Sequence, residues 1–163
     1  MRLSRVDGTH AMTHSAPPPT TDIGERALPY IVLVVALVAT IGSLTFSEVF
    51  GWIPCMLCWY QRILMYPIVI IAGMSIVRND IAGIPLLVLP FSVPGALLAL
   101  YHYLLIKTDW FPPPACNTGV PCTVDYIDLY GFINIPFMSL TAFVLISATC
   151  WVIYQTTATA DAE

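Results

Sequence analysis

The nine residues 54–62 read PCMLCWYQR and stand between two long apolar runs. Cys55 and Cys58 are two residues apart at the predicted start of a helix, where free backbone N–H groups and the helix dipole favour a thiolate over a thiol. Arg62 follows Cys58 by four residues, so on a helix the two side chains share one face. An arginine inside an apolar segment costs roughly 2.5–3.5 kcal/mol on insertion scales, which predicts a function for Arg62.

The composition around this stretch is that of a membrane protein. Hydrophobic residues make up 58% of the 163 residues and charged residues only 10%, whereas a soluble domain carries about 25% charged residues. The net charge of −4 is weak and scattered, and the sequence contains no glycine-rich phosphate loop or basic aromatic patch. We therefore expect membrane lipid around the protein and no nucleic-acid partner.

Four apolar runs predict four transmembrane helices, at about residues 30–50, 59–77, 81–106 and 133–154. At 1.5 Å per residue, each run is long enough to cross a hydrocarbon core of about 30 Å. The expected fold is an all-α membrane protein, a bundle of four transmembrane helices at residues 30–155. Residues 1–29 are polar and lack the apolar segment of a signal peptide, so we expect a disordered tail there and a second tail at 156–163.

The charges predict the orientation of the bundle. With four spans, the first and third connections lie on one side of the membrane and both termini lie on the other. Four arginines belong to the side of the termini: Arg2, Arg5, Arg26 and Arg78. Lys107 and the partly embedded Arg62 belong to the opposite side. The positive-inside rule therefore predicts cytoplasmic N and C termini in a cell membrane, with the cysteine-containing connections on the oxidising, extracytoplasmic side.

Five cysteines are present, and four of them form two close pairs in these connections: Cys55, Cys58, Cys116 and Cys122. Sequence alone leaves three pairings open, and the within-loop pairing needs the least chain closure, so we favour it as the resting form. A disulfide across a two-residue gap closes a very small ring and adds little stability, which argues against a purely structural role. The fifth cysteine, Cys150, lies in the last apolar run, where we expect a small apolar filler.

Metal binding is not expected. The five-residue gap between Cys116 and Cys122 fits zinc ribbons badly, and the predicted location favours oxidation. His10 and His14 lie in the polar N-terminal tail without other ligands.

Two further polar residues have two readings each. His102, flanked by tyrosines near the end of the third span, belongs either to an interfacial aromatic cluster or to a site where it donates a hydrogen bond to a ligand at the depth of Arg62. Glu48, at the outer end of the first span, is either an ordinary interfacial acid or a proton relay.

A redox relay accounts for these features better than structural disulfides do. One cysteine pair near the water phase would meet a soluble thiol protein, and the other would lie at the membrane edge. The electrons then need an acceptor, and a membrane-dissolved quinone is the natural one. Arg62 would polarise a quinone carbonyl and stabilise the negative charge that develops there.

Residues 54–62 closely resemble the signature of the DsbB/BdbC family of disulfide bond formation proteins. The resemblance covers roughly residues 30–155 and extends to Cys116, Cys122 and residues 130–137, which read YGFINIPF. It implies a bacterial membrane enzyme that reoxidises a DsbA-like, thioredoxin-fold oxidase and passes the electrons to ubiquinone or menaquinone. The short gap between Cys116 and Cys122 makes the chain more similar to the BdbC branch.

The resemblance also implies roles for individual residues. Catalytic roles fall on Cys55, Cys58, Cys116 and Cys122. Cys116 would form the mixed disulfide with the partner, and Cys122 would then attack Cys55 and free Cys58 to reduce the quinone. Quinone-binding roles fall on Cys58, Arg62 and His102.

Two other functions stay open. An oxidoreductase like vitamin K epoxide reductase would share the quinone, the CxxC pair and the four-helix bundle, but it places its loop pair before the CxxC pair. A disulfide-braced membrane subunit without catalysis would hold cysteines that resist mild reductants, and it would bind no quinone.

Overall fold

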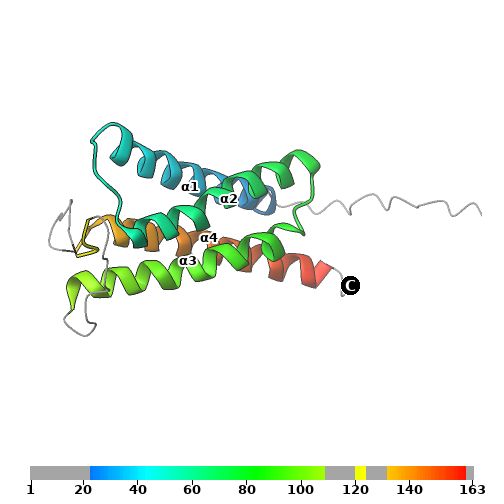
Figure 1. The fold of residues 1–163 in the computed structure, drawn as a ribbon. Coiled ribbons are helices and arrows are strands. Elements are labelled where there is room, and N and C mark those ends of the chain that lie inside the picture. Colours follow the sequence, from blue (N-terminus) through cyan, green and yellow to red (C-terminus); the bar gives the residue numbers. More distant parts are fainter. Residues whose placement is uncertain (1–22, 109–119, 124–131, 161–163) are drawn as a thin grey trace, which may run out of the picture.

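Four long helices make up most of the described chain (Figure 1). The computed structural model describes residues 23–108, 120–123 and 132–160. The helices are α1 (Ile23–Glu48), α2 (Met56–Arg78), α3 (Ile84–Lys107) and α4 (Ile135–Ala160). All four are long and apolar enough to cross a membrane, which confirms the predicted all-α fold with four transmembrane helices.

The outer helices extend past the predicted spans. α1 begins at Ile23, so residues 23–29 are helical although we predicted them as part of a disordered tail. Backbone hydrogen bonding needs no apolar side chains, and Ala27 and Leu28 have high helix propensity, so the helix starts before the apolar run does. α4 likewise runs past the predicted end at residue 154 to Ala160. The remainder of both predicted tails lies outside the described residues.

Side-chain caps determine where α2 and α4 begin. Cys55 is the N-cap of α2, with an extended backbone (φ −70°, ψ 170°), and its sulfur accepts a hydrogen bond from the backbone N–H of Cys58. Asn134 caps α4, since its Oδ1 accepts the N–H of Phe137 at 3.1 Å. Such caps satisfy N–H groups that a helix start leaves unpaired. They explain why α2 starts at Met56 rather than at residue 59, and α4 at residue 135 rather than 133.

A tight turn joins α2 to α3. Asn79 has a left-handed backbone (φ 55°, ψ 32°), and its N–H bonds back to the last carbonyls of α2, as is common where a helix ends. Asp80 accepts the N–H of Gly83 through Oδ1 at 3.1 Å, and Pro85 lies in the first turn of α3. This turn occupies the residues after Arg78, so α3 begins at Ile84 instead of the predicted residue 81.

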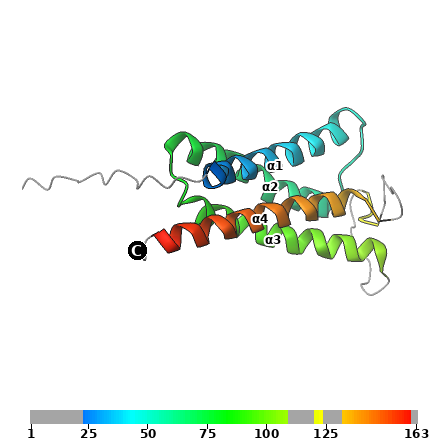
Figure 2. The same cartoon turned by 180° about the vertical axis from the view of Figure 1, so that it is seen from behind.

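The helices form an antiparallel ring in which α1 and α3 each pack against both α2 and α4. Figures 1 and 2 show the start of α1 and the end of α4 at one end of the bundle, with the end of α3, the start of α4 and the α1–α2 connection at the other. Cys55 and Cys122, which belong to the α1–α2 and α3–α4 connections, therefore lie at the same end.

α3 and α4 pack closely against each other in the core. Phe143 is fully buried against Gly95, where an added Cβ would lie 2.3 Å from a carbon of the phenyl ring. Ser147 donates its hydroxyl to Ser92 at 3.0 Å. Small residues and hydroxyl pairs of this kind allow transmembrane helices to approach closely. Cys150 lies fully buried in the same core, as expected for a filler.

The outer surface of the bundle is apolar. Large side chains such as Val77, Leu86 and Val38 are 87%, 79% and 66% exposed. A soluble protein rarely exposes apolar surface on this scale, whereas a bilayer solvates it.

Candidate functional site

Two thiols stand at the start of α2. Cys55 Sγ lies 3.0 Å from Cys58 Sγ and donates a hydrogen bond to it. Because a disulfide bond is about 2.05 Å long, the structure holds this pair in its reduced form, and the resting disulfide stays a prediction. The direction of the hydrogen bond leaves Cys58 as the acceptor, the sulfur better suited to carry negative charge.

Cys55 is the thiol that keeps its proton. The hydrogen bond to Cys58, together with burial, raises the pKa of Cys55 from 9.0 to about 12, and the contact with His102 opposes this only in part. The site therefore holds a proton on Cys55 at neutral pH, and the predicted role of Cys58 as the thiol that meets the quinone stays a prediction.

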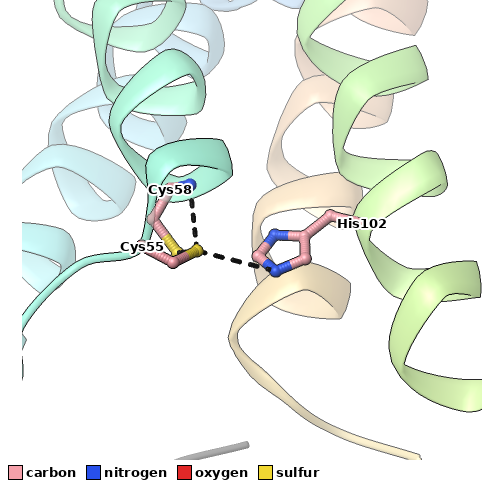
Figure 3. A group of neighbouring side chains, drawn as sticks. All are labelled: Cys55, Cys58 and His102. Atoms are coloured by element: carbon pink, nitrogen blue, oxygen red, sulfur yellow. Dashed lines mark hydrogen bonds between the residues drawn. The ribbon is translucent and has the colours of Figure 1, made fainter. Parts of the chain in front are cut away.

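His102 reaches the thiol pair from α3 (Figure 3). Its Nε2 lies 3.8 Å from Cys55 Sγ and 3.1 Å from the carbonyl oxygen of Cys122. Its Nδ1 lies 3.1 Å from Nε2 of Gln61. A Gln61 amide that donates to Nδ1 leaves the proton on Nε2, which then donates to the Cys122 carbonyl. His102 and Gln61 are both buried, so these contacts satisfy polar groups away from water.

Cys122 comes to the same place from the α3–α4 connection. It is buried and packs in a small apolar cluster with Cys55, Leu57 and Leu105. The structure thus brings together three of the four cysteines predicted to be catalytic. The fourth, Cys116, lies outside the described residues.

Arg62 is anchored to α1. Its Nη2 donates to the carbonyl oxygen of Ser43 at 2.9 Å and to the hydroxyl of Ser47. The guanidinium carbon lies 5.6 Å from the ring centre of Trp59, within the range of a cation–π interaction. These contacts offset the cost of placing a charge in an apolar segment. As predicted from the spacing, Arg62 and Cys58 face the same space.

That space is a cavity of about 400 Å³ whose wall includes Cys58, Arg62 and His102. Most of its lining is apolar and comes from α1, α2 and α4. Val38 on α1 and Leu145 on α4 line it and are also 66% and 49% exposed, so this part of the cavity wall also belongs to the outer apolar surface. Its size and mostly apolar wall are those of a small-molecule site.

Tyr66 adds an unused polar group to this wall. Its hydroxyl is buried and has no hydrogen-bond partner among the described residues. A buried hydroxyl without a partner costs free energy, so a ligand carbonyl at this end of the cavity would be stabilised by it. Glu48 differs, because it is exposed at the end of α1. Its role as a proton relay stays a prediction.

Sequence reasoning missed Gln61, Tyr66 and the two serines that hold Arg62. Gln61 could have been found, because an amide three residues after Cys58 lies on the same helix face and is unusual in an apolar span. No local signal pairs Ser43 or Ser47 with Arg62, since the contact joins two helices.

Comparison with known proteins identifies the family of the chain. A family model described as "Disulfide bond formation protein DsbB" matches residues 25–153. "Disulfide bond formation protein C" of Bacillus subtilis is 49% identical over 118 residues, which cover 72% of this chain and 85% of the relative. "Probable disulfide formation protein C 1" of Bacillus anthracis is 42% identical over 121 residues, with 74% and 86% covered. No solved structure matches the chain.

Proposed function

Because the chain belongs to the DsbB family of disulfide bond formation proteins, we propose that it oxidises a DsbA-like, thioredoxin-fold dithiol oxidase and passes the electrons to a membrane quinone. The membership makes the chain a membrane thiol oxidoreductase of disulfide formation. The relatives named protein C confirm the predicted similarity to the BdbC branch.

The cavity beside Cys58 is the observation that carries the quinone part of the proposal. Its apolar walls suit an isoprenoid tail, and the exposure of part of that wall on the outer apolar surface suits a ligand dissolved in lipid. Arg62 and the unpartnered hydroxyl of Tyr66 are donors for the ring carbonyls. A quinone bound there supplies the oxidant, taking two electrons and two protons as the Cys55–Cys58 disulfide forms.

The residues of the chain carry the thiol exchange. A thiolate of the reduced partner attacks Cys116 of the Cys116–Cys122 disulfide and releases Cys122 as a thiolate. Cys122 attacks Cys55 of the Cys55–Cys58 disulfide, so that a Cys55–Cys122 bond forms and Cys58 leaves as a thiolate. The shared burial of Cys55 and Cys122 supports this step, and the helix start with the nearby Arg62 stabilises the leaving thiolate.

A second exchange completes the turnover. The remaining thiol of the partner attacks the partner–Cys116 bond, and the oxidised partner leaves. The Cys116 thiolate attacks Cys122, which restores the Cys116–Cys122 bond and frees Cys55.

We propose that both termini lie in the cytoplasm of a bacterial cell. The end of the bundle that holds Cys55 and Cys122 then lies on the extracytoplasmic side of the cell membrane. The distribution of arginines supports this orientation. It also sets the exchanging thiols in an oxidising compartment, where disulfides persist.

The experiment that tests the proposal is quinone reduction by the detergent-purified protein supplied with a reduced thioredoxin-fold oxidase. Wild type is compared with Cys58→Ser, Cys116→Ser and Arg62→Ala, and Cys150→Ala is the matched cysteine control. We expect turnover in wild type and the control, none in either serine variant, and a raised KM for quinone in Arg62→Ala. If wild type reduces no quinone with any dithiol donor, the proposal is wrong and a structural role for the disulfides becomes the better account.

A further inference from the structure

The thiol pair and His102 form a group with the composition of a metal site. The two sulfur atoms and a ring nitrogen of His102 all lie within 4.8 Å of one another (Figure 3). Cys55 Sγ is 3.0 Å from Cys58 Sγ and 3.8 Å from Nε2 of His102. Tetrahedral zinc, with Zn–S near 2.3 Å and Zn–N near 2.0 Å, holds such atoms about 3.5–3.8 Å apart. Side-chain shifts of about 1 Å or less would complete the arrangement.

We propose that Cys55, Cys58 and His102 bind one zinc ion when the cysteines are reduced, and that this binding competes with formation of the Cys55–Cys58 disulfide. Two thiolates and one imidazole are ligands that zinc prefers, and sites with three protein ligands keep a fourth position for water. All three residues line the cavity, so the fourth position faces space where a water molecule fits.

Gln61 supplies the second layer of this site. A histidine that binds zinc through Nε2 carries its proton on Nδ1, and that N–H needs an acceptor. The Gln61 amide lies 3.1 Å from Nδ1. Its oxygen and nitrogen exchange places by a simple flip of the amide, so the same side chain serves as donor without metal and as acceptor with it.

The redox state of the pair controls the site. Zinc binding to two thiols releases two protons and involves no electron transfer, because zinc has no redox chemistry of its own. In the disulfide form neither sulfur is a thiolate, so the site loses two of its three ligands. Bound zinc holds both sulfurs and moves Nε2 of His102 away from the Cys122 carbonyl, and both changes stop the exchange at the reduced stage.

The site does not rest on the proposed quinone reaction, since it needs only the dithiol. Cysteine spacing alone did not predict it, because the third ligand lies 47 residues from Cys55. From the sequence, a site of four cysteines and a site at His10 and His14 were the metal sites considered, and no metal was expected.

Direct metal titration tests the site. The full-length protein in detergent, with the changes Cys116→Ser and Cys122→Ser to remove the other pair, is reduced and freed of reductant without oxygen. Zinc is then titrated in competition with a coloured chelator, and cadmium is titrated separately to record thiolate-to-metal absorption in the ultraviolet. We expect one equivalent bound per reduced chain, a cadmium–thiolate band, and no binding after oxidation to the Cys55–Cys58 disulfide.

Variants identify the ligands. His102→Ala and Gln61→Ala should each weaken zinc binding about tenfold or more, and Cys58→Ser should abolish the cadmium–thiolate band. Cys150→Ala should bind as the parent does, which controls for a thiol elsewhere in the bundle. Equal zinc affinity in the oxidised protein, or in both Cys58→Ser and Gln61→Ala, would overturn the proposal even if His102→Ala failed to fold.

Discussion

Nε2 of His102 lies 3.1 Å from the carbonyl oxygen of Cys122. This contact joins α3 to the α3–α4 connection. In that connection, Cys122 packs in the same apolar cluster as Cys55, at the start of α2. A histidine that the sequence analysis considered as a quinone ligand therefore has both ring nitrogens engaged by groups of the protein. Its role at a quinone stays a prediction.

The first prediction concerns this contact. His102→Leu removes the hydrogen bond to the Cys122 carbonyl, whereas His102→Gln keeps an N–H donor near the position of Nε2. A hydrogen bond contributes about 0.5–1.5 kcal/mol, so disulfide exchange between Cys122 and Cys55 should slow roughly two- to tenfold in His102→Leu and less in His102→Gln. Rapid acid quenching followed by thiol alkylation measures the exchange. An unchanged rate in a correctly folded His102→Leu protein would contradict the role of the contact.

The second prediction concerns pH. The raised pKa of Cys55, about 12, means that its thiolate is scarce at neutral pH and increases tenfold per pH unit until that pKa is approached. In the reduced protein, alkylation of Cys55 by iodoacetamide should rise about tenfold per unit from pH 8 to pH 11 without a plateau near 9. Peptide mass spectrometry follows each cysteine separately.

Its control removes the largest cause of the shift. In Cys58→Ala the Cys55 thiol loses the sulfur to which it donates, so the pKa of Cys55 falls towards its ordinary value and the plateau moves to lower pH. A Cys55 that reacts at the same rate at pH 8 and pH 10 would show that the hydrogen bond runs in the other direction.

The third prediction tests the cavity. A Cβ added at Gly42 meets nothing within 4 Å, because Gly42 faces the cavity. Gly42→Leu should therefore fold normally while its side chain fills part of the site, and the KM for quinone should rise at least tenfold. Gly42→Ala is the matched control and should change the KM little. Equal KM values for quinone in Gly42→Leu and Gly42→Ala would show that the quinone binds outside this cavity.

The fourth prediction tests the close packing between α3 and α4. A Cβ at Gly95 would lie 2.3 Å from the ring of Phe143, and forced overpacking costs about 1–3 kcal/mol. Gly95→Ala should lower the midpoint of thermal unfolding in detergent, although alanine alone favours a helix. Gly42→Ala shares the gain in helix propensity without the clash, and Phe143→Leu should partly rescue Gly95→Ala.

Much of the fold follows from the sequence because membranes impose simple rules. Apolar runs of sufficient length predict helices, and because successive spans alternate in direction, the first and third connections, which hold the cysteines, lie at one end of the bundle. The boundaries were less accurate because local hydrogen bonds decide them. The Cys55 cap, the Asn79 turn and the Asn134 cap each depend on backbone geometry that hydropathy does not contain.

The candidate site, like the fold, could be predicted from the sequence only in part. The common face of Cys58 and Arg62 follows from their spacing on one helix, and both line the same cavity. The contacts of Gln61 and Cys122 with His102 span 41 and 20 residues, and such contacts depend on how the helices pack. The anchoring of Arg62 by α1 was hidden for the same reason, since serines in an apolar span predict close helix packing equally well.

Part of the cavity wall, including Val38 and Leu145, is also exposed on the outer apolar surface, which changes what concentration means for a ligand that reaches the cavity through this wall. A molecule that enters there is supplied from within the bilayer, so its mole fraction among the lipids determines occupancy, and its molarity in the bulk solution does not. Adding inert lipid or detergent at a fixed total amount of ligand therefore lowers the mole fraction of the ligand among the lipids, and the occupancy of the site falls with it. Affinities measured in different micelles or vesicles are comparable only when each is expressed as a mole fraction of ligand among the lipids.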